Sequence, residues 1–155
     1  MREVGPADAT LTVKTYREGV AAKAGHDLII EVTRWSARIG DDGAVELSAD
    51  PRSLEVREGL RGAKPLSDRD RREILKNIEG KILGTQPIEF RGTAAGDDVE
   101  GELTMAGATR PLTVQRTADG GHATVTQSQW GIKPYRGLMG ALKVRDDVEV
   151  IVTGL

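Results

Sequence analysis

The chain has 155 residues, enough for one hydrophobic core of ordinary size. Its 22 basic and 24 acidic residues leave a formal charge of −2, which gives no strong field to recruit nucleic acid or an anionic membrane surface. It has no cysteine, which excludes disulfides, zinc-thiolate sites and thiol nucleophiles. No apolar run reaches the roughly 18 residues of a membrane-spanning helix, and the first residues lack the apolar core of a secretory signal. We therefore expect one domain over residues 1–155, in the cytoplasm, with no nucleic-acid partner and no integral membrane segment.

Apolar and polar residues alternate in many short segments, which Gly- and Asp-containing turns separate. The segments cover residues 10–16, 28–39, 45–49, 88–90, 99–105, 112–114, 123–125 and 148–152. Alternation with a period of two is typical of antiparallel strands that bury one face. The chain is therefore predicted to be mainly β.

The long segment 28–39 changes its apolar phase once. Ile30 and Val32 share one phase, and the alternation resumes at Trp35 after an odd step near Arg34. Such a step indicates a bulge that bends the sheet, as closure into a barrel requires. About eight strands leave an interior just wide enough for side chains or one slim ligand. We expect a closed, lipocalin-like antiparallel barrel of about eight strands.

Residues 67–80 interrupt the β pattern with apolar residues at helical spacing. Ser67 is predicted to cap the N-terminus and Gly80 to end the helix. Ile74, Leu75 and Ile78 are expected to face the barrel, while Arg71, Arg72 and Lys76 are expected to face water. This inserted helix should cover an open edge or one barrel end. A lid over the mouth of a pocket is the alternative role.

The inward-facing residues follow from the parity of the strands. We predict that the interior is lined by Ile30, Val32, Trp35, Phe90, Leu103, Met105, Leu112, Val114 and Val125. Parity does not decide whether these side chains contact one another or a ligand. The chain has only two Trp, two Tyr and one Phe, so it has few bulky groups with which to fill a barrel. The indole N–H of Trp35 is expected to find a backbone partner.

Residues 130–142 mix large apolar side chains with glycines. They are predicted to form a short helix or loop that caps one barrel end. In a second interpretation, Leu138, Met139 and Leu142 form an adaptable gate for an apolar ligand, since Met suits irregular apolar surfaces. Lys133 and Arg136 would then lie near the polar head of that ligand.

Candidate catalytic groups are few. His26 and Asp27 could form a base with its orienting carboxylate, but a histidine at the start of a strand more often bonds backbone. The paired carboxylates 41–42, 97–98 and 146–147 lie in turns or at strand starts, where they are expected to be structural. No phosphate-binding glycine loop is present. We predict no catalytic residue, no metal site and no cofactor other than a bound lipid.

Four segments together resemble the YceI-like family of polyisoprenoid-binding proteins. They are Gly-His-Asp-Leu at 25–28, Gln-Pro-Ile-Glu-Phe at 86–90 as an edge strand, the strand-loop-strand GELTMAGATRPLTV at 101–114, and Trp-Gly-Ile at 130–132. The resemblance covers nearly the whole chain. Many members instead carry an Arg-Asp-x-His-Leu segment with an aromatic-rich loop where this chain has its polar helix, and many begin with a secretion signal.

The resemblance implies a lipocalin-like barrel that holds a long isoprenoid chain without catalysis. We therefore expect a non-enzymatic carrier of an apolar small molecule or lipid, involved in transport or storage. Two alternatives stay open, a filled barrel that serves as a protein-interaction module and an enzyme that uses His26. A homodimer is compatible with the sequence.

Overall fold

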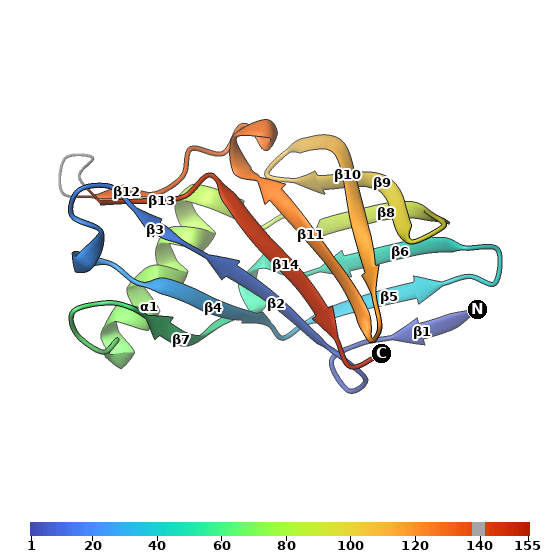
Figure 1. Ribbon diagram of the computed structural model, residues 1–155, viewed down its shortest axis with the longest axis horizontal. Helices are drawn as coiled ribbons and strands as arrows, with labels where there is room; N and C mark the ends of the chain where they lie inside the picture. Colours follow the sequence, from blue (N-terminus) through green and yellow to red (C-terminus); the bar gives the residue numbers. More distant parts are fainter. Residues whose placement is uncertain (138–141) are drawn as a thin grey trace.

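The structure is a computed structural model that describes residues 1–137 and 142–155 (Figure 1). The strands are β1 (Arg2–Val4), β2 (Thr10–Thr15), β3 (Arg17–Glu18), β4 (Asp27–Val32), β5 (Trp35–Ile39), β6 (Ala44–Ala49), β7 (Leu54–Leu60), β8 (Ile88–Ala95), β9 (Asp98–Met105), β10 (Ala108–Thr117), β11 (Gly120–Thr126), β12 (Arg136–Gly137), β13 (Leu142–Val144) and β14 (Asp147–Thr153). The helical segments are η1 (Ala22–Ala24), η2 (Pro51–Ser53), α1 (Asp68–Asn77), η3 (Ile78–Leu83) and η4 (Gln127–Trp130). The chain is mainly β, as predicted.

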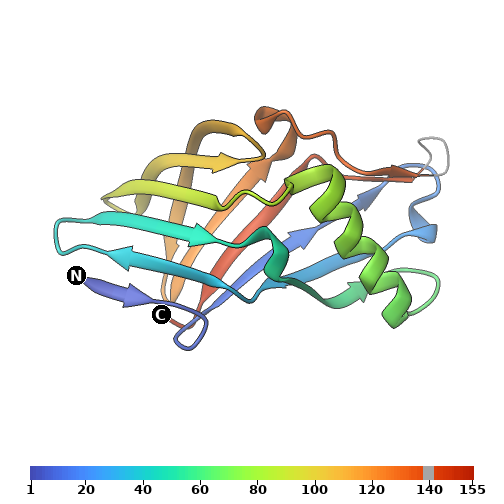
Figure 2. The same ribbon diagram turned by 180° about the vertical axis from the view of Figure 1, so that it is seen from behind.

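Eleven of the described strands form one sheet, in the order β1-β5-β6-β8-β9-β10-β11-β14-β2-β4-β7. Its ladders are antiparallel. The sheet is a strongly curled half-barrel (Figures 1 and 2). A second sheet joins β12, β13 and β3 in that order. Residues 86–90 were expected to form an edge strand, but β8, which begins at Ile88, lies inside the large sheet between β6 and β9.

The hydrogen-bonded sheet differs from the expected closed barrel of eight strands, because its order ends at β1 and β7. The difference arises where the chain turns a corner. Thr33 and Arg34 separate β4 from β5, and η2 lies between β6 and β7. The amide of Thr33 donates to the carbonyl of Ser53 at 2.9 Å, and that of Asp50 donates to the carbonyl of Arg34 at 3.0 Å. The predicted run 28–39 is therefore divided into β4 and β5. The phase change near Arg34 is a corner between two strands rather than the predicted bulge, and the register shift of β4 against β7 lies between Ile29 and Ile30.

The helix begins where the sequence predicts and ends later. Ser67 caps α1, and the side chain of Asp70 accepts a reciprocal hydrogen bond from the Ser67 amide at 3.0 Å. That backbone hydrogen bond lowers the pKa of the Asp70 carboxyl. Gly80 does not end the helix, because the chain continues through a π-helical turn, η3, to Leu83. Gly84 ends it with φ of 70°, the left-handed region that favours glycine.

The burial of α1 also differs from the prediction at Arg71. Figure 2 shows the helix running from beside β7 toward the start of β8. Arg71 was expected in water, but its Nη1 donates to the backbone oxygens of Val56 at 2.6 Å and Arg57 at 3.1 Å. Both carbonyls belong to β7, an end strand of the sheet. Arg72 and Lys76 are exposed, as expected. The helix therefore covers the β7 edge, which is the predicted structural role.

The strand-loop-strand 101–114 is a tighter hairpin than the sequence suggests. Ala106 and Gly107 have φ of 51° and 80°, and Met105 pairs directly with Ala108. Two consecutive residues with positive φ are typical of the tight turns that match strand twist. The loop was expected to cover residues 106–111, but residues 108–111 belong to β10.

Most of the buried apolar residues form two clusters. The first contains Phe90, Val99, Leu103, Met105, Val125, Trp130, Ile132 and Val148. The second contains Val4, Ala9, Leu11, Val32, Trp35, Ala37 and Ala49. Partly buried Val13, Leu47, Ile88 and Val150 pack against both. The two clusters therefore share one interior.

Candidate functional site

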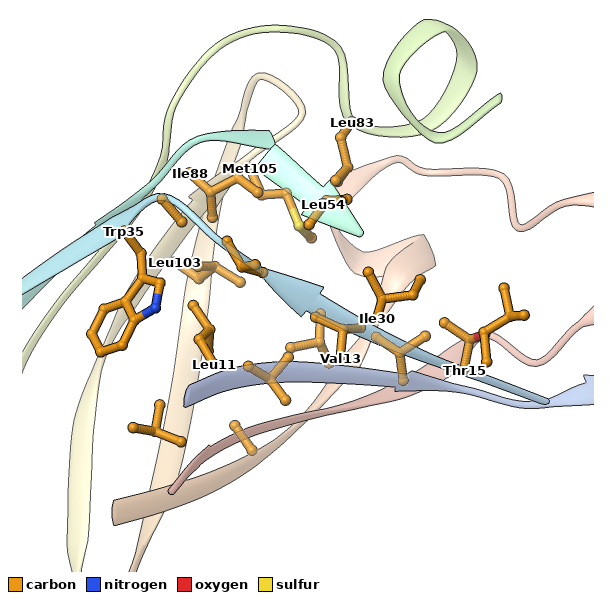
Figure 3. Close-up of a pocket in the computed structure, with 18 of the residues that line it drawn as sticks. Leu11, Val13, Thr15, Ile30, Trp35, Leu54, Leu83, Ile88, Leu103 and Met105 are labelled. Atoms are coloured by element: carbon orange, nitrogen blue, oxygen red, sulfur yellow. The ribbon is translucent and has the colours of Figure 1, made fainter. Parts of the chain in front are cut away.

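The curled sheet surrounds a large apolar cavity. Its volume is about 1250 Å³, whereas ligand pockets commonly measure roughly 300–1,000 Å³ and packed interiors contain few voids larger than a water molecule. Figure 3 shows side chains from several strands pointing into it, among them Leu11, Ile30 and Leu103. The space is thus large enough for a sizeable ligand.

The nine side chains predicted from strand parity all line this cavity. They are Ile30 and Val32 of β4, Trp35 of β5, Phe90 of β8, Leu103 and Met105 of β9, Leu112 and Val114 of β10, and Val125 of β11. Six strands therefore present their predicted inner faces to one space. Trp35, the first residue after the corner, is turned inward as the phase shift predicts.

Several liners were not among the predicted set. They include Leu11 and Val13 of β2, Leu47 of β6, Ile88 of β8, and Val148, Val150 and Val152 of β14. The signal that identifies them is the same alternation, since each belongs to an alternating segment of the sequence. Their strands complete the wall.

Some inward side chains remain partly exposed although they lie within the wall. Val13, Leu112, Val114 and Val150 are only half-buried, and all four line the cavity. A residue inside a filled core would contact side chains on every side and lose nearly all of its accessible surface. The partial exposure of these four therefore reflects open space in front of them.

Charged side chains lie toward the two ends of the cavity. Arg17, His26, Lys64, Asp70, Glu73 and Lys143 line the end beside α1. Arg2, Asp41 and Arg116 line the opposite end. Ile74 and Ile78 of the helix contribute to the lining as predicted, while Leu75 is half-buried and is not among the lining residues. The middle of the cavity is apolar and both ends are polar.

His26 and Asp27 do not form a base with its orienting carboxylate. The Nε2 atom of His26 lies 2.5 Å from the carbonyl oxygen of Lys64. The Asp27 carboxylate accepts a hydrogen bond from the Arg17 amide at 2.8 Å and pairs with the guanidinium of Arg61. The backbone role that the sequence favoured for His26 is therefore confirmed.

Residues 130–142 were predicted to form a short capping helix or loop, and the part of them that the structure describes includes two short strands. Residues 127–130 form the 3-10 turn η4, and residues 136–137 and 142–144 form β12 and β13. Ile132 lines the cavity, but Lys133 and Arg136 do not; Tyr135 and Lys143 do. Two predicted gate residues, Leu138 and Met139, lie outside the described residues. The third, Leu142, begins β13.

The carboxylates at 146–147 are structural, as expected. Asp146 accepts hydrogen bonds from the amide and hydroxyl of Ser128, at 2.8 and 2.5 Å. Asp147 accepts one from the hydroxyl of Thr126 at 2.6 Å. Within residues 1–137 and 142–155, no three His, Cys, Asp or Glu side chains gather where a metal ion could bind. No helix in that same part of the chain has the length and apolar character needed to cross a membrane.

The comparisons with known proteins agree with this geometry. The sequence model of the YceI-like domain matches residues 8–154. No curated protein matches the chain. Among solved structures, a polyisoprenoid binding domain from Saccharophagus degradans, implicated in plant cell wall breakdown, is similar over 99% of this chain and 97% of its own, with 12% identity and a TM-score of 0.52. At this identity the likeness supports the fold.

Proposed function

Because the chain belongs to the YceI-like domain family, we propose that it binds a long apolar ligand, a polyisoprenoid or another lipid, inside its cavity. The observation that carries the proposal is the apolar cavity of about 1250 Å³ inside the curled sheet. The similar structure from Saccharophagus degradans is described as a polyisoprenoid binding domain, which supports the same ligand class. The residues that would contact the hydrocarbon of the ligand are the predicted cavity-lining residues, among them Ile30, Leu103 and Met105, which Figure 3 labels.

Hydrophobic burial alone is sufficient for such binding. Each buried methylene contributes about 0.8 kcal/mol, so ten of them contribute on the order of 8 kcal/mol before ordering costs. A charged anchor in the middle of the cavity is not required. The charged residues at the ends, such as Arg17 and Lys143, leave the middle to the hydrocarbon.

The role is binding and carriage rather than catalysis. His26, the residue on which an enzymatic reading depended, contacts the Lys64 carbonyl, and Asp27 contacts Arg17 and Arg61. The filled-barrel alternative conflicts with the volume of the cavity. A cytoplasmic location, a single domain and homodimer formation remain predictions from the sequence.

Organic extraction of the purified protein followed by mass spectrometry tests the proposal. We expect a substoichiometric apolar chain, and we expect delipidated protein to bind an added polyprenol. The expression host can supply a substitute lipid, so occupancy is the informative result. Protein that carries no lipid and also ignores added polyprenol would contradict the carrier function.

A further inference from the structure

The indole N–H of Trp35 is a buried donor with no acceptor among the residues that the structure describes. The sequence predicted a backbone partner for it, and that prediction is wrong. The side chain is 7% exposed and lines the cavity. Figure 3 shows the nitrogen-bearing edge of its ring turned toward the interior, on the side where Leu11 and Leu103 lie. Buried polar groups are nearly always paired, so this N–H needs an explanation.

The other tryptophan shows that this fold can satisfy a buried indole. Trp130 is 2% exposed, and its Nε1 donates to the backbone oxygen of Leu103 at 2.8 Å. Its N–H therefore has a protein acceptor. The donor of Trp35 is turned toward the interior in which we propose that the ligand binds, but neighbouring side chains cover it, so a ligand oxygen reaches it only when these side chains move aside. The contrast points to an acceptor that the ligand supplies.

The surroundings of Trp35 restrict the chemistry of that acceptor. Ala49 lies opposite Trp35 on β6, and Ile88 lies opposite Ala49 on β8. Of the charged liners, Arg2 is the one on the neighbouring β1 ladder, and it pairs with Ile39, four residues or about 13 Å along β5 from Trp35. A carboxylate or phosphate would lose its hydration here without gaining a cation. The acceptor should therefore be uncharged.

Water and hydroxyl groups fit less well than a simple acceptor. A buried water usually makes about three hydrogen bonds, whereas the neighbours named above offer it apolar side chains beside one N–H. A ligand hydroxyl has a hydrogen of its own to place, and it would need a second partner. A carbonyl or ether oxygen only accepts. It would satisfy Trp35 and leave no group unpaired.

We propose that Trp35 Nε1 donates a hydrogen bond to an uncharged carbonyl or ether oxygen of the bound lipid. The inference rests on the proposed function and narrows its ligand class to an apolar chain with such an oxygen partway along it. Trp35 lies between Leu28, seven residues earlier, and Ile39, four residues later, and both of these also line the cavity. The oxygen would therefore lie well inside the cavity.

Two probes that differ in one oxygen test the inference. Each displaces a fluorescent lipid from delipidated protein: one is a straight-chain ketone with a mid-chain carbonyl, the other is the alkane of equal length. In Trp35→Phe, the ratio of ketone affinity to alkane affinity should fall about three- to tenfold, the value of one neutral hydrogen bond. Trp130→Phe is the matched control. Its ratio should stay within twofold of the wild-type value, because the Trp130 donor is already held by Leu103.

A second measurement does not depend on how well Trp35→Phe folds. In Trp130→Phe, the only indole N–H signal in a proton–nitrogen NMR spectrum comes from Trp35. The ketone should move its proton resonance downfield, and the alkane should not. An indole signal that ignores bound ketone, or a ratio unchanged in Trp35→Phe, would overturn this inference and leave the carrier function standing. If neither probe displaced the fluorescent lipid, both proposals would fail together.

Discussion

At the residue scale, the buried carboxylate of Asp27 organises the end of the cavity beside α1. Its side chain is 7% exposed, and its two oxygens contact the Arg17 amide and the Arg61 guanidinium. Arg17 in turn donates to the backbone oxygens of Ala22 and Gly25, at 3.1 and 3.2 Å. One carboxylate therefore links β4 to β3 and to the loop after β7.

Arg61 combines this ion pair with an unusual backbone conformation. Two substitutions separate the contribution of the ion pair to stability from that of the backbone strain. Its φ is 62°, a region where a side chain is strained and glycine is not. Arg61→Ala should lower the free energy of unfolding by about 1–2 kcal/mol, a discounted value because the guanidinium is 65% exposed to water. Arg61→Gly loses the same ion pair but relieves the backbone, so it should be about 0.5–1 kcal/mol more stable than the alanine variant.

Urea denaturation of both variants measures the difference, provided that the slopes agree. The two substitutions differ by one methyl group, so each serves as the control for the other. An alanine variant as stable as the glycine variant would show that residue 61 does not hold its left-handed conformation in solution.

At the scale of elements, α1 is attached to the sheet by a polar contact as well as by its apolar face. Ile74 and Ile78 line the cavity, while Arg71 donates to two carbonyls of β7. A strand at the end of a sheet exposes unpaired backbone groups that invite other chains. Arg71 binds two carbonyls of this strand from within the molecule, which explains why a residue on a polar helix lies half-buried.

Removal of this contact should loosen the helix. Arg71→Ala loses two charge-assisted hydrogen bonds, one of which is exposed, so we expect a decrease of about 1–2 kcal/mol in the free energy of unfolding. Arg72→Ala is the matched control, since Arg72 is exposed and next in sequence. It should change stability by less than about 0.5 kcal/mol. Thermal unfolding compares the two variants.

The same pair of variants distinguishes a cover from a lid. A helix that acts as a lid must open for the ligand to leave, so a weaker attachment should speed dissociation of a bound fluorescent lipid. Dissociation at the wild-type rate from a destabilised Arg71→Ala would restrict α1 to a structural role. Equal stability of the Arg71→Ala and Arg72→Ala variants would show that the hydrogen bonds from Arg71 to β7 contribute nothing to the free energy of unfolding.

At the scale of the whole molecule, much of the interior was predictable because burial has a simple period in strands. Nine liners from six strands follow from alternation alone. What alternation cannot predict is how separate runs pair. The corner at Thr33 and Arg34 depends on backbone hydrogen bonds with Ser53 and Asp50, and β12, β13 and β3 meet from distant parts of the sequence.

The helix shows a similar limit to what the sequence predicts. Its cap at Ser67 is a local signal and was predicted, whereas its continuation through Gly80 follows a π-helical turn that the glycine did not prevent. The partners of Arg71 and Trp35 are set by tertiary structure: the first gained backbone acceptors and the second has none among the described residues. The hydrogen-bond partners of buried polar side chains were therefore the least predictable property of the site.

Whether the molecule is hollow can be tested by adding volume to its inner wall. Val13 lies on β2 between Val150 and Ile30 of the neighbouring strands, and it lines the cavity while only half-buried. In a filled core, Val13→Phe would overpack its neighbours and lower stability by about 1–3 kcal/mol. In a hollow interior, the ring enters open space and buries apolar surface, so stability should be unchanged or higher.

The affinity for the ligand should fall although stability does not. This combination distinguishes a cavity that binds the lipid from one that stays empty. The phenyl ring of Val13→Phe would occupy space that the lipid needs, and the affinity for a polyprenol should fall by about tenfold or more. The matched control is Thr12→Phe, because Thr12 is the preceding residue of β2, is close to Val in shape, and is not among the lining residues. Its affinity should stay near the wild-type value. Displacement of a fluorescent lipid measures the affinity, and urea denaturation of the same protein samples measures the stability.

A destabilised Val13→Phe would support a filled interior, because added volume is harmful only where no space exists. A stable Val13→Phe with wild-type affinity would instead place the lipid outside the cavity wall that β2 forms.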